Sequence, residues 1–136
     1  MNDVLIDTGC IVALLDRDEH AHSRCVDALK TVSGRLVTCE AVIAESCYLL
    51  RQRKGAVDTI LDNVERGVFQ IPVRLEEMAA SVRAHMKRYA RIPMDLADGC
   101  LVALAEILGI GRILTLDGDF QIYRWRRTRR FENLID

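Results

Sequence analysis

Short apolar runs alternate with longer stretches of helical periodicity along this chain. The first run, residues 4–6, is wholly apolar and is followed by Asp7, Thr8 and Gly9. Apolar residues then continue at the density of a helix. This pattern predicts a buried strand, a turn and a helix.

The same alternation continues to about residue 116. β-like runs predict further strands over residues 35–38, 67–73 and 111–116. Helical periodicity predicts helices over residues 20–32, 41–52, 56–65, 75–89 and 96–108. Short strands separated by longer helices are typical of a parallel sheet with helices on both faces. The expected fold class is α/β, a three-layer α/β/α arrangement with a mostly parallel central sheet.

The composition fits a single domain over residues 1–136. The chain is 50% hydrophobic and 29% charged, with 8 glycines and 2 prolines, and no linker divides it. Its five cysteines show no zinc-ligand spacing, so we expect reduced thiols and a cytoplasmic protein. No apolar run reaches the roughly 18 residues of a membrane span, and no basic leader precedes the first strand. We expect neither membrane insertion nor secretion.

The net charge of −1 conceals a basic C-terminal segment. Residues 121–136 hold five arginines against Glu132 and Asp136, a local charge of +3. Arginines around a tryptophan suit a phosphate backbone and a stacked base, and a solvated surface segment is an equal alternative. The candidate nucleic-acid contacts are Arg124, Arg126, Arg127, Arg129 and Arg130.

Acidic residues follow two of the predicted strands. Asp7 ends the first strand, and Asp117 and Asp119 follow the strand over residues 111–116. In an open parallel sheet, ligands bind outside the carboxyl ends of the strands. Asp7 is also a good helix N-cap, so taken singly it establishes no site.

Two acids within predicted helices are more informative. Glu45 lies three residues after Val42 and four before Leu49, so helical spacing puts its carboxylate on an apolar stripe. Asp98 lies three residues before Leu101 on another such stripe. A carboxylate facing the core is costly unless it is paired, protonated or bound to a metal.

A local alternative remains open for Asp98, since Asp95 is a candidate N-cap and Asp98 would then occupy the third helical position. No arginine or lysine lies near Glu45 on its stripe, so we expect that carboxylate to converge with the others. The expected cluster comprises Asp7, Glu45, Asp98 and Asp117, with Asp95 and Asp119 as neighbours. An all-oxygen cluster selects Mg²⁺ or Mn²⁺ over zinc and suits the hydrolysis of phosphodiesters.

Four segments carry a resemblance to a known family. They are residues 4–9 (VLIDTG), 44–50 (AESCYLL), 94–106 (MDLADGCLVALAE) and 113–120 (ILTLDGDF). In this order they resemble a PIN domain. The whole chain looks like a VapC-type toxin, a PIN-domain ribonuclease that is paired with an antitoxin.

The resemblance implies that the catalytic acids are Asp7, Glu45, Asp98 and Asp117. It implies that Mg²⁺ or Mn²⁺ is held by Asp7, Asp98 and Asp117, with support from Thr8, Asp95, Thr115 and Asp119. Residues 117–120 are one residue shorter than a common family form, so either Asp117 or Asp119 is the fourth acid. The family relation also implies an RNA substrate, an antitoxin and a homodimer.

Other function classes compete with this hypothesis. An aspartyl-phosphate receiver or phosphatase fits less well, because the first strand lacks an acidic pair and no lysine follows Thr115. A non-catalytic PIN-like binding module would lose one of the four acids, and none is lost. A housekeeping RNA-processing nuclease remains an alternative. We favour a metal-dependent endoribonuclease toxin, whose antitoxin covers the acidic cleft and an apolar patch around Ile11, Leu14 and Leu15.

Overall fold

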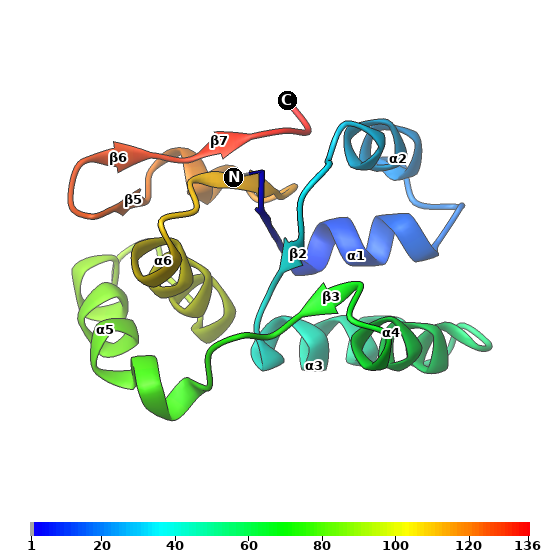
Figure 1. The fold of residues 1–136 in the computed structure, drawn as a ribbon, viewed down its shortest axis with the longest axis horizontal. Helices are drawn as coiled ribbons and strands as arrows, with labels where there is room; N and C mark the ends of the chain where they lie inside the picture. Colours follow the sequence, from blue (N-terminus) through cyan, green and yellow to red (C-terminus); the bar gives the residue numbers. More distant parts are fainter. Residues whose placement is uncertain (1) are drawn as a thin grey trace.

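A computed structural model describes residues 2–136 and contains a five-stranded sheet with helices packed around it (Figure 1). Its strands are β1 (Val4–Ile6), β2 (Leu36–Val37), β3 (Phe69–Gln70), β4 (Arg112–Leu114) and β7 (Glu132–Asn133). They lie in the order β3-β2-β1-β4-β7, and each neighbouring pair is parallel. The predicted α/β fold with a mostly parallel sheet is confirmed.

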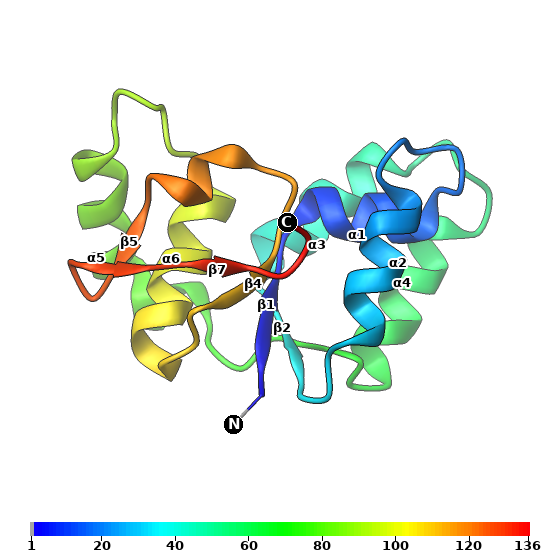
Figure 2. The same ribbon diagram turned by 90° about the horizontal axis from the view of Figure 1, so that it is seen from above.

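The helices cover both faces of this sheet. They are α1 (Thr8–Leu15), α2 (His22–Lys30), α3 (Glu40–Leu49), α4 (Ala56–Glu65), α5 (Leu75–Arg88) and α6 (Leu96–Leu108). Figure 2 shows α5 and α6 on one side of the sheet, with α1, α2 and α4 on the other. The structure therefore has the three layers that the alternating pattern predicted.

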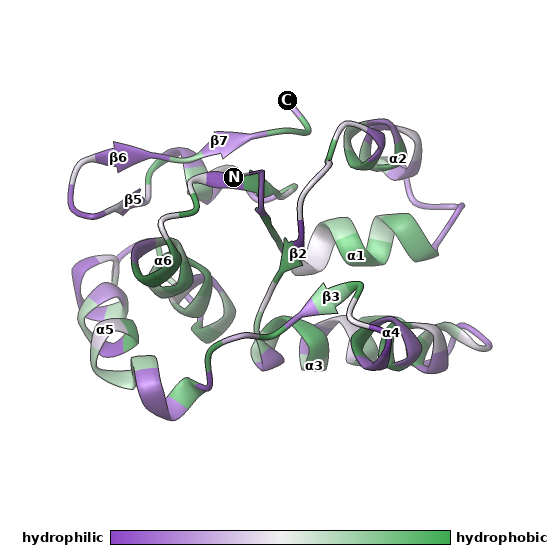
Figure 3. Ribbon diagram, viewed as in Figure 1, coloured by the Kyte–Doolittle hydropathy of each residue, from purple (hydrophilic) through white to green (hydrophobic). Residues whose placement is uncertain are grey.

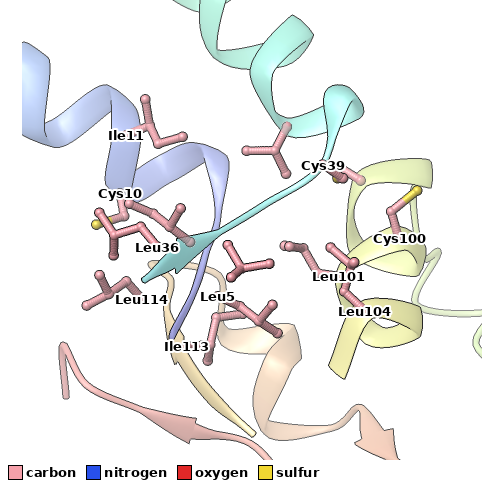
Figure 4. Close-up of a cluster of buried hydrophobic side chains, with 14 of the residues drawn as sticks. Leu5, Cys10, Ile11, Leu36, Cys39, Cys100, Leu101, Leu104, Ile113 and Leu114 are labelled. Atoms are coloured by element: carbon pink, nitrogen blue, oxygen red, sulfur yellow. The ribbon is translucent and has the colours of Figure 1, made fainter. Parts of the chain in front are cut away.

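The core lies on both faces of the central strands. All three residues of β1 are fully buried, as a strand covered by helices on each side requires. Leu5 of β1 and Ile113 of β4 lie beside Leu101 and Leu104 of α6 (Figure 4). Hydropathy colouring shows mostly apolar residues along α6 and a mixture of apolar and polar residues along α4 and α5 (Figure 3).

Helix α6 has well-defined ends. The Asp95 carboxylate is its N-cap and accepts a hydrogen bond from the Asp98 backbone N–H at 2.8 Å. Gly109 ends the helix at a φ of 68°, a left-handed conformation that glycine adopts without steric cost. These two caps fix the register of α6, and with it the position of its first turn.

The C-terminal segment is folded, which the sequence pattern did not indicate. After the short helix η1 (Gly118–Gln121), strands β5 (Arg124–Trp125) and β6 (Arg129–Arg130) form an antiparallel hairpin, and the chain then enters the sheet as β7. The Trp125 side chain is buried, so its indole is not available to stack on a base. It packs against Gly111, where a Cβ would lie 2.5 Å from the indole ring.

Two further expectations concern the environment of the protein. Within residues 2–136, no helix is long and apolar enough to cross a membrane. All five cysteines are free thiols, and four of them are buried. The sulfhydryl groups therefore act here as small core side chains.

Candidate metal centre

The strand order brings three aspartates to one point on the carboxyl edge of the sheet. β2 lies on one side of β1 and β4 on the other, so the direction of chain progression reverses between β1 and β4. Parallel sheets bind ligands in the crevice at such a switch point. Asp7 directly follows β1, Asp117 follows β4, and Asp98 lies in the first turn of α6 beside them.

The carboxylates of Asp7, Asp98 and Asp117 form a compact acidic cluster. One oxygen from each lies within 4.8 Å of the others. Asp7 and Asp98 are only 5% exposed, and Asp117 is half-buried. The ion pairs found among residues 2–136 involve none of these three acids. Grouped buried carboxylates without a cationic side chain have the donor set and charge that a divalent cation requires.

Hydrogen bonds hold two of the three carboxylates in place. Asp7 accepts from the Thr8 backbone N–H at 2.7 Å and from the Thr115 hydroxyl at 2.8 Å. Asp117 accepts from the Asp119 backbone N–H at 2.9 Å, while its own N–H donates to the Thr115 hydroxyl at 3.0 Å. Thr115 therefore links Asp7 to Asp117. Asp7 also serves as the N-cap of α1, so the capping interpretation and the cluster coexist.

The carboxylate of Asp98 is held differently. Asp95 does cap α6, as the local alternative predicted, but this cap uses the Asp98 backbone and leaves its side chain to face the cluster. The Tyr123 hydroxyl donates a hydrogen bond to Asp98 Oδ2 at 2.9 Å. Burial and the charge of Asp98 raise the pKa of Tyr123 well above its usual value, so this hydroxyl keeps its proton.

Burial changes the acidity of the cluster. It raises the pKa of Asp98 to about 8, with further increases from the charges of Asp7 and Asp95. It also raises the pKa of Asp7 to about 6, against hydrogen bonds from Thr115 and Thr8 that lower it. Without a cation the cluster therefore binds protons, and a cation must displace them.

The position of Glu45 corrects the reasoning that selected it. α3 buries Val42, Ile43 and Ser46, whereas Glu45 and Leu49 are exposed. A residue three positions after one buried side chain can still lie on the next face of a helix, and Glu45 does so. Its carboxylate accepts a hydrogen bond from the Thr8 hydroxyl at 2.7 Å and faces the cleft, outside the three-aspartate cluster.

The cluster lies in a cleft of about 380 Å³. Three exposed or half-buried apolar side chains and eight other residues line it, among them the acids Asp7, Glu19, Glu45, Asp95, Asp98 and Asp117. Glu19 and the neighbouring donor Tyr123 were not predicted. Asp119, the alternative fourth acid, does not line the cleft and contacts Asp117 through its backbone N–H.

The five arginines of the C-terminal segment do not act as one group. Arg124 donates to backbone carbonyls, including that of Gln121 at 2.8 Å, and Arg126 donates to the Glu106 carbonyl at 2.9 Å. Glu106 is eight residues along α6 from Asp98, a rise of about 12 Å. Arg127, Arg129 and Arg130 are exposed, and the Arg129 guanidinium also lies over the Trp125 ring, 5.1 Å from its centroid.

Comparison with known proteins agrees with this fold. The family model of the PIN domain matches residues 4–125, so the chain belongs to the PIN domain family. Among solved structures it is similar to VapC20 of Mycobacterium tuberculosis, described as a sarcin-ricin loop cleaving toxin. The two share 18% sequence identity with a TM-score of 0.81, over 93% of this chain and 98% of that one. A comparison with curated protein sequences gave no match.

Proposed function

We propose that this protein is a Mg²⁺- or Mn²⁺-dependent endoribonuclease. The observation that carries the proposal is the cluster of three carboxylates within 4.8 Å of one another, without an ion-pair partner among residues 2–136, in a PIN-family chain. Oxygen donors of this kind prefer hard divalent cations. Asp7, Asp98 and Asp117 would hold the ion.

The chemistry follows from the charge of the substrate. When bound, the ion neutralises charge on a phosphodiester and lowers the pKa of an attacking water. Glu45 is exposed in the same cleft, and Thr8 holds its Oε1, which leaves Oε2 to orient water or accept a proton. Thr115 keeps Asp7 and Asp117 at a fixed separation by contacting both.

An acidic cleft repels a polyanion, so binding requires cationic side chains nearby. The exposed Arg127, Arg129 and Arg130 on the β5–β6 hairpin would supply phosphate contacts. Arg124 and Arg126, which bond to the protein's own carbonyls, would stabilise the hairpin.

We further propose that the nuclease is the toxin of a toxin–antitoxin pair and a homodimer. VapC20, which has the same fold, is described as a toxin. An antitoxin segment that covers the cleft would meet exposed Leu49 and Leu116 at its wall. Of the residues around which the apolar patch was expected, Ile11 is instead fully buried, and Leu14 and Leu15 are half-buried. Growth inhibition on expression would support the toxin assignment. A mass near twice 15.4 kDa in solution would support the homodimer.

The test of the proposed activity is cleavage of an end-labelled RNA by the purified chain. We expect no cleavage in EDTA, recovery on addition of excess Mg²⁺ or Mn²⁺, and strong loss of rate in Glu45→Gln. Glu65→Gln, the same change at an exposed position of α4 outside the cleft, is the control and should cleave normally. Cleavage that persists in EDTA would contradict the proposal, as would a normal rate in Glu45→Gln.

A further inference from the structure

Tyr123 carries a polar group into the core beside the acidic cluster. Its side chain is 0% exposed, and its hydroxyl donates to Asp98 Oδ2 at 2.9 Å. A buried tyrosine hydroxyl requires a hydrogen-bond partner, and here the partner belongs to the candidate metal centre.

Aromatic packing fixes the position of the Tyr123 ring. The ring meets Tyr89 and Phe120 edge to face, with centroids 5.0 Å away in each case. Phe120 in turn packs edge to face on Phe131 at 5.3 Å, which ties the ring to the C-terminal segment. The Tyr123 backbone N–H also donates to the Asp119 carbonyl at 3.1 Å. The hydroxyl is therefore aimed by a rigid cluster.

The Asp98 carboxylate depends on this one contact. Asp7 accepts two hydrogen bonds from the protein and Asp117 accepts one from the adjacent turn. Within residues 2–136, the Tyr123 hydroxyl is the only group that donates a hydrogen bond to the Asp98 side chain. It occupies Oδ2 and leaves Oδ1 available as a ligand atom.

We propose that Tyr123 is a positioning residue that orients the Asp98 carboxylate for the divalent cation, an inference that rests on the proposed function. Partners that hydrogen-bond to a metal ligand fix its orientation, and their loss typically weakens metal binding about 10–100-fold. Tyr123→Phe keeps the ring and its packing and removes only the hydroxyl. We therefore expect it to raise the Kd for Mn²⁺ by about 10–100-fold.

The neighbouring Tyr89 provides a matched control. Its hydroxyl accepts a hydrogen bond from the Arg124 backbone N–H at 3.0 Å and contacts no acid of the cluster. Mn²⁺ binding to wild type, Tyr123→Phe and Tyr89→Phe is measured on the full chain from the electron paramagnetic resonance signal of unbound Mn²⁺. Melting temperatures without metal report folding separately. We expect weakened binding in Tyr123→Phe and near wild-type binding in Tyr89→Phe.

The outcomes separate this inference from the function on which it rests. Wild-type binding of Mn²⁺ with an equal Kd in folded Tyr123→Phe overturns the positioning role and leaves the metal centre standing. Equal weakening in both variants also overturns it, because the effect then comes from general loss of packing. Failure of the wild type to bind Mn²⁺ overturns the metal centre itself.

A measurement that keeps the Tyr123 hydroxyl covers the case in which Tyr123→Phe does not fold. The chain has 3 tyrosines, so labelling with 3-fluorotyrosine gives three ¹⁹F signals. Tyr48→Phe and Tyr89→Phe assign two signals directly and the third by elimination. We expect Mg²⁺ to shift the Tyr123 signal more than that of Tyr89. A stationary Tyr123 signal, at Mg²⁺ concentrations that raise the melting temperature, would refute the contact's role.

Discussion

At the scale of single residues, the buried acids connect the candidate site to stability. Burial raises the pKa of Asp98 to about 8 and that of Asp7 to about 6, from an ordinary value of 3.8. Between pH 3.8 and about 8 the folded protein therefore binds more protons than the unfolded chain does. The contribution of these two acids to the free energy of unfolding is therefore full below about pH 4 and is lost as pH rises toward 8.

Replacing Asp98 tests this linkage. Asp98→Asn removes the charge and keeps an oxygen that accepts from Tyr123, so it should raise the melting temperature of the metal-free protein at pH 8.5. At pH 5 the native acid is already protonated, and the gain should be small. Thermal unfolding in EDTA at both pH values measures this difference. A gain of the same size at the two pH values would contradict the raised pKa.

The sequence predicted the acids of the cluster better than it predicted their partners. Asp7, Asp98 and Asp117 were found because hydrophobic runs locate strand ends and helix starts, and topology then brings these points together. Helical spacing placed Glu45 on a core-facing stripe, but its side chain is exposed. Tyr123 gave no signal, since its contact with Asp98 spans 25 residues and depends on tertiary packing.

At the scale of elements, periodicity located the helices because each has an apolar face and several have clear caps. The observed α4 and α6 coincide with the predicted ranges 56–65 and 96–108. The hairpin β5–β6 and strand β7 escaped prediction because they are short and rich in arginine and other polar residues. These strands are held in place by the burial of Trp125 and by the pairing of β7 with β4. Both are tertiary contacts, which the local sequence pattern does not reveal.

The contact between the hairpin and the sheet predicts a sharp requirement for glycine. In Gly111→Ala the new methyl group would meet the Trp125 indole at 2.5 Å, so we expect a loss of about 1–3 kcal/mol in the free energy of unfolding. Gly118→Ala enters open space and is the control. Urea unfolding measures both. Equal stability of the two variants would show that the indole does not pack as described.

The exposed arginines of the hairpin predict a change in salt dependence. Replacing Arg127, Arg129 and Arg130 with glutamine should weaken binding to all RNA sequences alike. The slope of the logarithm of the binding constant against the logarithm of the salt concentration should become shallower by about one unit per lost contact. Cleavage at saturating RNA should change little. Arg124→Gln should lower stability and leave the slope unchanged, because that side chain donates to backbone carbonyls. An unaltered slope in the triple variant would exclude phosphate contacts at these positions.

At the scale of the whole molecule, the site joins parts of the chain that are distant in sequence. Asp7 and Asp117 follow two neighbouring strands, and Asp98 lies at the start of a helix, so the cluster joins three separate parts of the chain. An unfolded chain cannot present this arrangement. A cation that binds the cluster therefore binds only the native state and stabilises it by mass action.

Metal addition should accordingly raise the melting temperature. A cation at about 100 times its Kd adds about 2.7 kcal/mol to the free energy of unfolding. Because protons compete for Asp98 and Asp7, the increase should be larger at pH 8 than at pH 5. Differential scanning calorimetry with Mg²⁺, Mn²⁺ or EDTA measures it. An unchanged transition across the titration would contradict a metal centre in this cleft.

The most direct test of the nuclease assignment is the RNA cleavage rate of Asp7→Asn with excess Mg²⁺ or Mn²⁺. Asparagine retains an oxygen that accepts from the Thr8 backbone N–H and so caps α1, and it removes the charge that a cation requires. We predict a folded protein whose rate falls by about 10²–10⁴-fold, beside a normal rate in the exposed control Asp58→Asn. A folded Asp7→Asn that cleaves RNA at the wild-type rate would contradict the assignment.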